Sequence, residues 1–177
     1  FDPEAASLEP FSSSWLWDWY YRLIVAIGAS GNAGNGIYSG HVRIYEYSNN
    51  TWTQLGADID GKYEKDESGF SVSLSSDGTR VAIGSPSNCC SFGPADNAGH
   101  VRIYEYSNNT WTQLGADIVG ETAGDKSGQS VSLSSDGTRV AIGSQHNAGN
   151  LSFDSYVGHV RIYEYSNNTV SYTHLTL

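Results

Sequence analysis

One block of 59 residues occurs twice in tandem in this chain, and a third copy begins directly after it. The first full copy spans 40–98 and the second spans 99–157, and 40 of the 59 positions are identical between them. The third copy opens at Gly158 and departs from the pattern after Thr169. Repeats of this length are typical of propellers, solenoids and arrays, in which each copy is one structural unit. The chain is therefore expected to stack copies of one unit.

Each unit is expected to contain four short strands and little helix. Residues 70–75 alternate serine with Val72 and Leu74, the period-two pattern of a strand, and 80–85 follow as the second strand. The third strand is expected at 41–47 and the fourth at 51–56. The acidic segment 57–69 is expected to connect one unit to the next. These elements predict a four-stranded antiparallel meander for each unit.

Two turn sequences join these strands. AspGly at 77–78 is a strong hairpin signal and predicts a type I′ turn, which needs positive φ at both central residues. AsnAsn at 49–50 predicts the turn between the third and fourth strands, for the same reason. Both turns recur in the second copy, so each unit is expected to contain two hairpins.

The four-stranded unit, with small residues in its first two strands, predicts an all-β fold built from β-propeller blades. Trp52 and Trp111 on the fourth strand are expected to pack between neighbouring blades. A propeller takes about four to eight blades, so we expect an incomplete fragment whose open edges meet neighbouring blades of the same longer chain. A β-trefoil is the alternative, because that fold closes with three repeats.

The repeat pattern divides the chain into six segments. Residues 1–22 do not match the repeat and are of doubtful origin, and the tail from Val170 also departs from it, so we interpret the tail as foreign sequence. Between them, the expected segments are a partial first repeat at 23–39, full repeats at 40–98 and 99–157, and the start of a further repeat at 158–169. The tail at 170–177 closes the chain.

Composition excludes several classes of function. The net charge of −10 opposes binding to nucleic acid or to an anionic membrane, because both require a positive field. No apolar stretch approaches the length of a membrane span, so no membrane insertion is expected. Cys89 and Cys90 are adjacent, which is too close for ordinary disulfide geometry. They are not expected to staple the fold.

The acidic segment contains weak calcium candidates. Asp58, Asp60 and Asp66 could present oxygen ligands from one loop. The second copy has Val119 where the first has Asp60, which disfavours a metal site unless only one repeat binds. As an alternative, Asp66 and its copy Asp125 are expected to hydrogen-bond loop amides, as in Asx turns. Both interpretations stay open at the level of sequence.

Basic and imidazole side chains recur on the third strand. His41, His100 and His159 occupy one position in successive copies, and we interpret them as satisfied structural histidines because equivalent positions lie too far apart to share one ion. The arginines two residues later are expected to meet a carboxylate or an aromatic ring of the adjacent unit. These are Arg43, Arg102 and Arg161.

The sequence lacks the common enzymatic motifs. It has no GlyXaaSerXaaGly elbow, no HisGluXaaXaaHis and no glycine-rich loop leading into a helix, so no catalytic residue, no cofactor and no enzymatic activity are expected. It does contain four sequons for N-linked glycan, although AsnAsn is also favoured by hairpin turns. The sequons begin at Asn49, Asn108, Asn150 and Asn167.

Three motifs in order resemble the FG-GAP repeat of integrin-α-type propellers. Gly69 and Phe70 match the first motif of that family. The second motif, GlyAlaPro in the family, corresponds here to Gly84, Ser85 and Pro86. The third match is the start of the third strand, with Gly99, Val101 and Tyr104. The resemblance covers Val25 to about Thr169. It implies an extracellular seven-bladed propeller for ligand binding or adhesion. The family's calcium loop, between the first two strands of a blade, is reduced here to Asp77 alone, so calcium is not expected in that turn.

These observations lead to two expected functions. The first is a non-catalytic extracellular or cell-surface β-propeller repeat module that binds a protein or glycan ligand and acts in adhesion. The alternative is a secreted carbohydrate-binding, lectin-like propeller, or an accessory domain of a larger secreted enzyme. In that alternative a sugar pocket is expected in the variable loops, 85–98 and 144–157.

Overall fold

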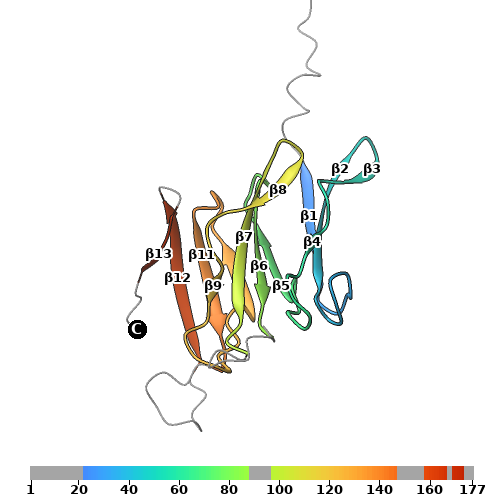
Figure 1. Ribbon diagram of the computed structural model, residues 1–177. Coiled ribbons are helices and arrows are strands. Elements are labelled where there is room, and N and C mark those ends of the chain that lie inside the picture. The colour runs from blue at the N-terminus through green and yellow to red at the C-terminus, as the bar shows by residue number, and fades with distance from the viewer. Residues whose placement is uncertain (1–21, 88–96, 147–157, 167–168, 174–177) are drawn as a thin grey trace, which may run out of the picture.

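The computed structural model describes residues 22–87, 97–146, 158–166 and 169–173. These residues form an all-β structure of several antiparallel sheets and contain no helix (Figure 1). The strands are β1 (Leu23–Ala29), β2 (His41–Ser48), β3 (Thr51–Gln54), β4 (Ile59–Asp60), β5 (Ser71–Leu74), β6 (Arg80–Ser85), β7 (His100–Ser107), β8 (Thr110–Gln113), β9 (Ile118–Val119), β10 (Ser130–Leu133), β11 (Arg139–Ser144), β12 (His159–Ser166) and β13 (Thr169–Thr173).

Each sheet is a meander, as the repeat predicts. The first sheet has the order β1-β2-β3, the second β5-β6-β7-β8 and the third β10-β11-β12-β13, all with antiparallel neighbours. None of the sheets in the described part of the chain closes into a barrel, which the β-trefoil alternative would require. The described residues thus form three separate sheets that follow one pattern.

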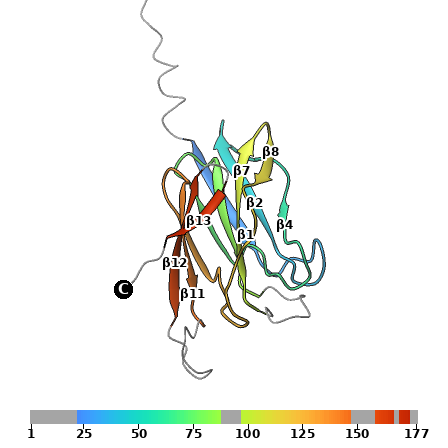
Figure 2. The same ribbon diagram turned by 60° about the vertical axis from the view of Figure 1, so that its left-hand side comes forward.

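The three sheets lie side by side in sequence order, with a hydrophobic core in each gap (Figures 1 and 2). Strand alternation explains the two cores. In β6, Val81 and Ile83 point into the core shared with the first sheet, whereas Ala82 points into the core shared with the third. All three are at most 1% exposed, so the second sheet is buried on both faces.

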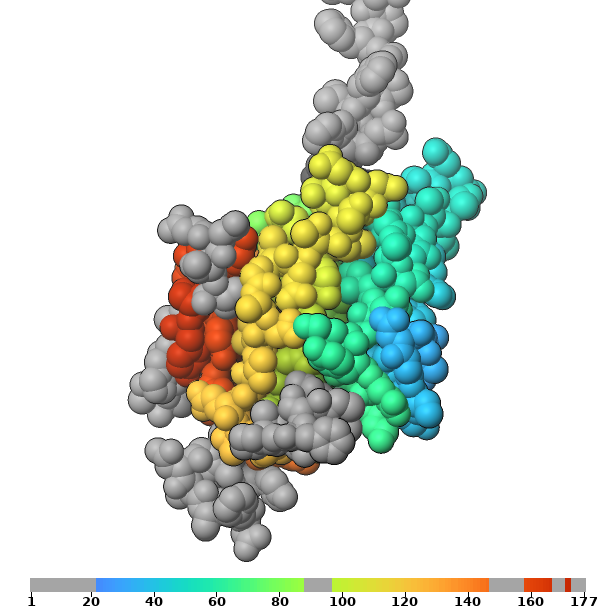
Figure 3. All heavy atoms as spheres, viewed as in Figure 1, coloured from blue at the N-terminus to red at the C-terminus, as the bar shows by residue number. Residues whose placement is uncertain are grey.

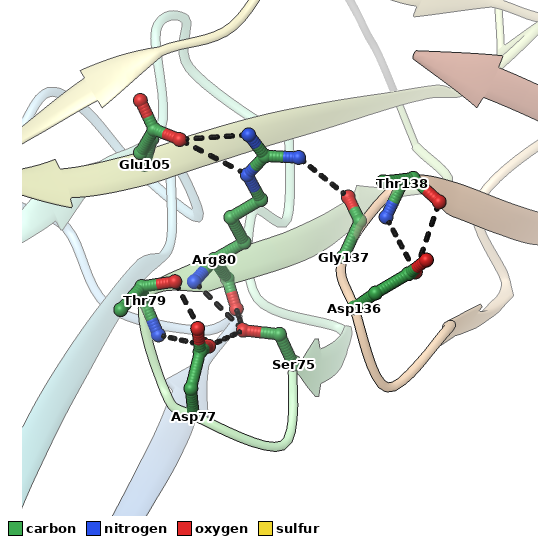
Figure 4. Close-up of polar contacts among 8 residues, drawn as sticks. All are labelled: Ser75, Asp77, Thr79, Arg80, Glu105, Asp136, Gly137 and Thr138. Atoms are coloured by element: carbon green, nitrogen blue, oxygen red, sulfur yellow. Dashed lines mark hydrogen bonds and ion pairs between the residues drawn. The ribbon is translucent and has the colours of Figure 1, made fainter. Parts of the chain in front are cut away.

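Polar contacts also cross from the second sheet to the third. Ser71 Oγ donates to the Gly128 carbonyl at 2.8 Å, and Ser73 Oγ accepts the Leu133 amide at 2.9 Å. Arg80 reaches from β6 to donate to the Gly137 carbonyl at 3.2 Å while its guanidinium pairs with Glu105 at 2.8 Å (Figure 4). The serine-rich first strands therefore join neighbouring sheets.

In the first and second sheets, the outer edge is paired over a longer stretch of chain than the sequence predicts. The predicted fourth strand, 51–56, pairs only as far as Gln54, and β4 then resumes the pairing with β2. The Leu55 amide bridges the gap by donating to the Ile44 carbonyl at 2.8 Å. The acidic segment 57–69 is thus partly strand, because Ile59 is buried in the core.

The two hairpin predictions have different outcomes. Asn49 and Asn50 have φ of 49° and 61°, so the AsnAsn turn is the two-residue type I′ turn that needs positive φ twice. The type I′ prediction for AspGly at 77–78 is wrong, because only Gly78 has positive φ there. A longer loop replaces it, in which the Asp77 carboxylate accepts the Thr79 amide at 2.9 Å and the Ser75 hydroxyl at 2.7 Å (Figure 4).

The tail that abandons the repeat still completes the third sheet. Residues 170–173 belong to β13, which pairs with β12 where the fourth strand of a unit is expected. The ring centroids of Tyr163 and Tyr172 lie 5.3 Å apart across this pair. Alternation of polar and apolar residues in the tail suffices for strand pairing, although its sequence differs from the repeat.

Candidate functional site between the repeats

An arginine lies buried between the first two sheets. Arg102 projects from β7, and its side chain is only 4% exposed. Its guanidinium lies 3.1 Å from the Asp117 carboxylate of its own sheet and 3.8 Å from that of Asp66, which precedes β5. The sequence predicts that the repeated arginine contacts a carboxylate of the adjacent unit. This prediction is confirmed for Arg102, whose partner Asp66 lies in the segment that connects the two units.

Asp66 serves this connecting segment as a hydrogen-bond acceptor. Its Oδ2 accepts the Lys62 amide at 3.1 Å and the Tyr63 amide at 3.0 Å, and the copy Asp125 accepts the Thr122 amide at 2.9 Å. The Asx-type hydrogen bonds considered in the sequence are therefore present. Asp66 is fully buried, and this burial raises the pKa of its carboxyl. At neutral pH the nearby guanidinium stabilises its ionised form.

His100 differs from the satisfied structural histidine that the sequence suggests. It is 1% exposed, and neither ring nitrogen has a hydrogen-bond partner among the described residues. Burial, together with repulsion from Arg102, lowers the pKa of His100 to about 4. Because the folded pKa lies below the ordinary value of about 6.5, the folded protein holds this imidazole neutral at pH values where the unfolded chain protonates it.

This histidine is expected to make the protein less stable in mild acid. Between pH 7 and pH 5, preferential protonation of the unfolded chain should lower the free energy of unfolding by about 2 kcal/mol. In His100→Leu, that part of the pH dependence should disappear. Urea titrations at pH 7, 6 and 5 measure how the free energy of unfolding changes with pH. If this pH dependence is the same in the variant and the parent, His100 is not its source.

The first sheet has the same arginine in an exposed position. Arg43 is 44% exposed and binds Asp58 through two nitrogens at 2.7–2.9 Å. Gln54 donates to the same carboxylate at 2.8 Å. The hydrogen bonds from Arg43 and then Gln54 lower the pKa of Asp58 to about 2. This pairing keeps Asp58 ionised at physiological pH.

A second acidic residue lies beside this pair. One ligating atom each from His41, Asp58 and Asp60 lie within 4.8 Å of one another. Asp66, the third calcium candidate from the sequence, is not among the residues of this group in the described part of the chain. The sequence alone does not indicate that His41 neighbours the two carboxylates, because only the register, which places His41 opposite Asp60, brings them together.

Repeat positions that are buried in the second sheet are exposed on the outer face of the first sheet. Ile27 is 54% exposed, whereas its counterpart Ile83 is 1% exposed. Trp111 packs between the first two sheets as predicted and donates from Nε1 to the Leu55 carbonyl at 2.8 Å. Its copy Trp52 is 46% exposed, so the prediction of packing does not hold for it. The first sheet thus presents an uncovered copy of an interface formed elsewhere in the chain.

A pocket of about 260 Å³ opens between the outer edges of the first two sheets. In Figure 3 the surfaces of these two sheets, turquoise and yellow, meet along this region. Residues 57–60 of the first sheet line one side, and two aromatic residues of the second sheet lie on the other. The lining residues are Ala57, Asp58, Ile59, Asp60, Tyr104, Asn109, Thr110 and Trp111.

The other sequence candidates fall on turns or outside the described residues. Asn49 and Asn108 are exposed in the hairpin turns, a position accessible to glycan attachment. Asn150, Asn167 and the cysteine pair lie outside the described residues, as do most of the two variable loops. No helix in the described ranges has the length and apolar character needed to cross a bilayer.

Comparisons with known proteins give little sequence similarity. No family model matches the chain, and no curated protein matches it. The chain is similar to the crystal structure of a candidate 6-phosphogluconolactonase from Bacteroides uniformis, with 13% sequence identity and a TM-score of 0.49. The match covers 75% of this chain and 33% of that one, so the chain spans about a third of that protein's length.

This match corrects one expectation from the sequence. The chain was expected to have no enzymatic activity because catalytic motifs are absent, and the similar structure is described as that of an enzyme. The absence of catalytic motifs is therefore not evidence against an enzymatic activity. The low identity and TM-score assign no reaction and no catalytic residue to this chain.

Proposed function

We propose that the chain is part of an extracellular β-propeller whose repeats are blades and whose loops bind a protein or glycan ligand, as in adhesion. The observation that carries the proposal is a constant scaffold with variable loops. Residues 71–85 and 130–144 are identical between the copies, whereas 86–98 and 145–157 differ at nearly every position. Loops that vary on a rigid scaffold are the usual location of binding residues.

The blade interpretation is supported by the uncovered face of the first sheet. Ile27, Tyr47 and Trp52 are exposed there, and their counterparts in the second sheet contact the preceding sheet. A further repeat, placed before the first sheet in a longer chain, would cover these side chains in the same way. Such continuation by stacked four-stranded sheets is the architecture of a propeller.

The binding role can be tested by exchanging the loops. In the full chain, 86–98 would be replaced by the sequence of 145–157, which leaves every strand unchanged. We expect surface plasmon resonance against immobilised glycans, fibronectin and collagen to detect a ligand for the parent and a changed profile for the variant. Identical profiles would contradict binding through these loops, and an absence of binding by the parent would contradict the proposed ligand classes.

A lectin-like function is the second candidate, and the pocket between the first two sheets favours it. Trp111 and Tyr104 can supply apolar ring surface to a sugar, while the polar side chains of Asn109 and Thr110 can form hydrogen bonds with its hydroxyl groups. This site lies on the sheets rather than in the variable loops. The same module could serve as an accessory domain of a larger secreted enzyme, with a separate flanking domain supplying the activity.

Filling this pocket is expected to abolish sugar binding if the lectin-like function is right. Thr110 is exposed and lines the pocket, so Thr110→Arg would place a long side chain in it. Thr51→Arg makes the same change in the first copy, outside the pocket, and should have no effect. A glycan array checks both variants, and equal binding by Thr110→Arg and the parent would exclude this pocket as the sugar site.

A further inference from the structure

We propose that His41, Asp58 and Asp60 form a binding site for a divalent transition-metal ion such as Zn²⁺. The three side chains offer one nitrogen and two oxygens within 4.8 Å of one another. Imidazole nitrogen favours Zn²⁺ over Ca²⁺, which prefers oxygen ligands alone. The site uses the third strand and the outer strand of the sheet, so it is separate from the turn between the first two strands.

The burial of His41 beside two carboxylates is the first observation that points to a ligand. It is 6% exposed, and its ring makes no hydrogen bond among the described residues. Its ring nitrogen lies instead near the two carboxylates, where a bound cation would give it a bond.

Asp60 supplies the second observation. Its carboxylate has no hydrogen bond or ion pair within the described ranges, whereas neighbouring Asp58 is held by Arg43 and Gln54. Asp58 is therefore fixed in position, and Asp60 remains available to a cation. Asp60 is exposed, which gives an ion a route from solvent.

The geometry permits closure around an ion. Ligand atoms about 2.0–2.2 Å from a tetrahedral Zn²⁺ lie about 3.3 Å apart. The three atoms therefore need to approach one another by at most about 1.5 Å. Asp60 is exposed and can make this movement by rotating its side chain, while a water molecule completes the coordination.

The second copy explains why only one site is expected. It retains His100 and Asp117 but has Val119 in place of Asp60, so one carboxylate is missing. Because the second copy has valine at this position, the repeat is expected to tolerate the same residue in the first copy. Asp60→Val should remove the site while leaving a residue that this strand position already accepts in the other copy.

The test is a Zn²⁺ titration of the full chain by isothermal calorimetry under reducing conditions. We expect one tightly bound ion per chain and a loss of affinity of about 100-fold or more in Asp60→Val and in His41→Leu. His100→Leu should retain the parent's affinity and stoichiometry. Co²⁺ added in place of Zn²⁺ should give a visible absorption band in the parent that is absent in Asp60→Val.

Two outcomes would overturn the proposal. One is the absence of saturable Zn²⁺ binding by a parent chain whose circular dichroism shows folded β structure. The other is binding that survives unchanged in both Asp60→Val and His41→Leu, since the ion would then be held elsewhere, for example by Cys89 and Cys90.

Discussion

Replacing Arg102 by alanine is expected to lower the free energy of unfolding by about 3–5 kcal/mol. The substitution leaves Asp66, which is fully buried, without the cation that stabilises its charge. It also removes the 3.1 Å pair with Asp117. Breaking a buried ion pair on one side is costly because the remaining charge stays desolvated. Urea unfolding followed by tryptophan fluorescence measures the loss.

Arg43→Ala is the matched control, because it removes the same residue from the same repeat position. Arg43 is 44% exposed and its carboxylate partner is 29% exposed, so water can replace the ion pair. We expect a change far smaller than that of Arg102→Ala. Equal effects of the two substitutions would show that the covering sheet does not determine the contribution of this arginine.

Replacing Gly84 by alanine is expected to separate the second sheet from the third and to destabilise the protein by more than about 3 kcal/mol. A Cβ at this position would lie 2.1 Å from the Gly128 carbonyl oxygen, which is backbone and cannot rotate away. The sheets would have to move apart, and the core behind Ala82 and Val101 would open. Thermal unfolding by circular dichroism measures the effect.

Gly143→Ala provides the comparison in the third sheet. Its added Cβ would lie 2.3 Å from the side-chain oxygen of Ser130, and that side chain can change rotamer. Among the described residues other than its two chain neighbours, no backbone atom lies closer than 3.8 Å to that position. A melting temperature near that of the parent is expected. If Gly143→Ala were as destabilising as Gly84→Ala, the close approach of the sheets would not be the cause.

The sequence predicts the sheets well because their signals are local. Alternation in 70–75 and in 80–85 depends only on neighbouring residues, and so does the AsnAsn turn. The AspGly turn was predicted incorrectly because side-chain hydrogen bonds from Ser75 and Thr79 to Asp77 stabilise a longer loop. Such bonds compete with the two-residue turn and are not visible in a dipeptide signal.

The candidate sites were harder to predict because they depend on register and stacking. Asp58 and Asp60 were identified from the acidic segment, but the pairing of β4 with β2 was needed to bring His41 to them. The burial of Arg102 and the exposure of Arg43 follow from which sheet has a neighbour, although both residues occur in identical sequence. Position in the stack, rather than local sequence, determines their environments.

We infer that each 59-residue copy adds one sheet to a stack through the same interface. The most direct test of this inference is a crystal structure of the full chain with one further copy of 40–98 inserted between Ala98 and Gly99. We expect a fourth four-stranded sheet inside the stack, with its arginine buried against the preceding sheet as Arg102 is here. An inserted copy that lies outside the stack, or that leaves its arginine exposed, would contradict the inference.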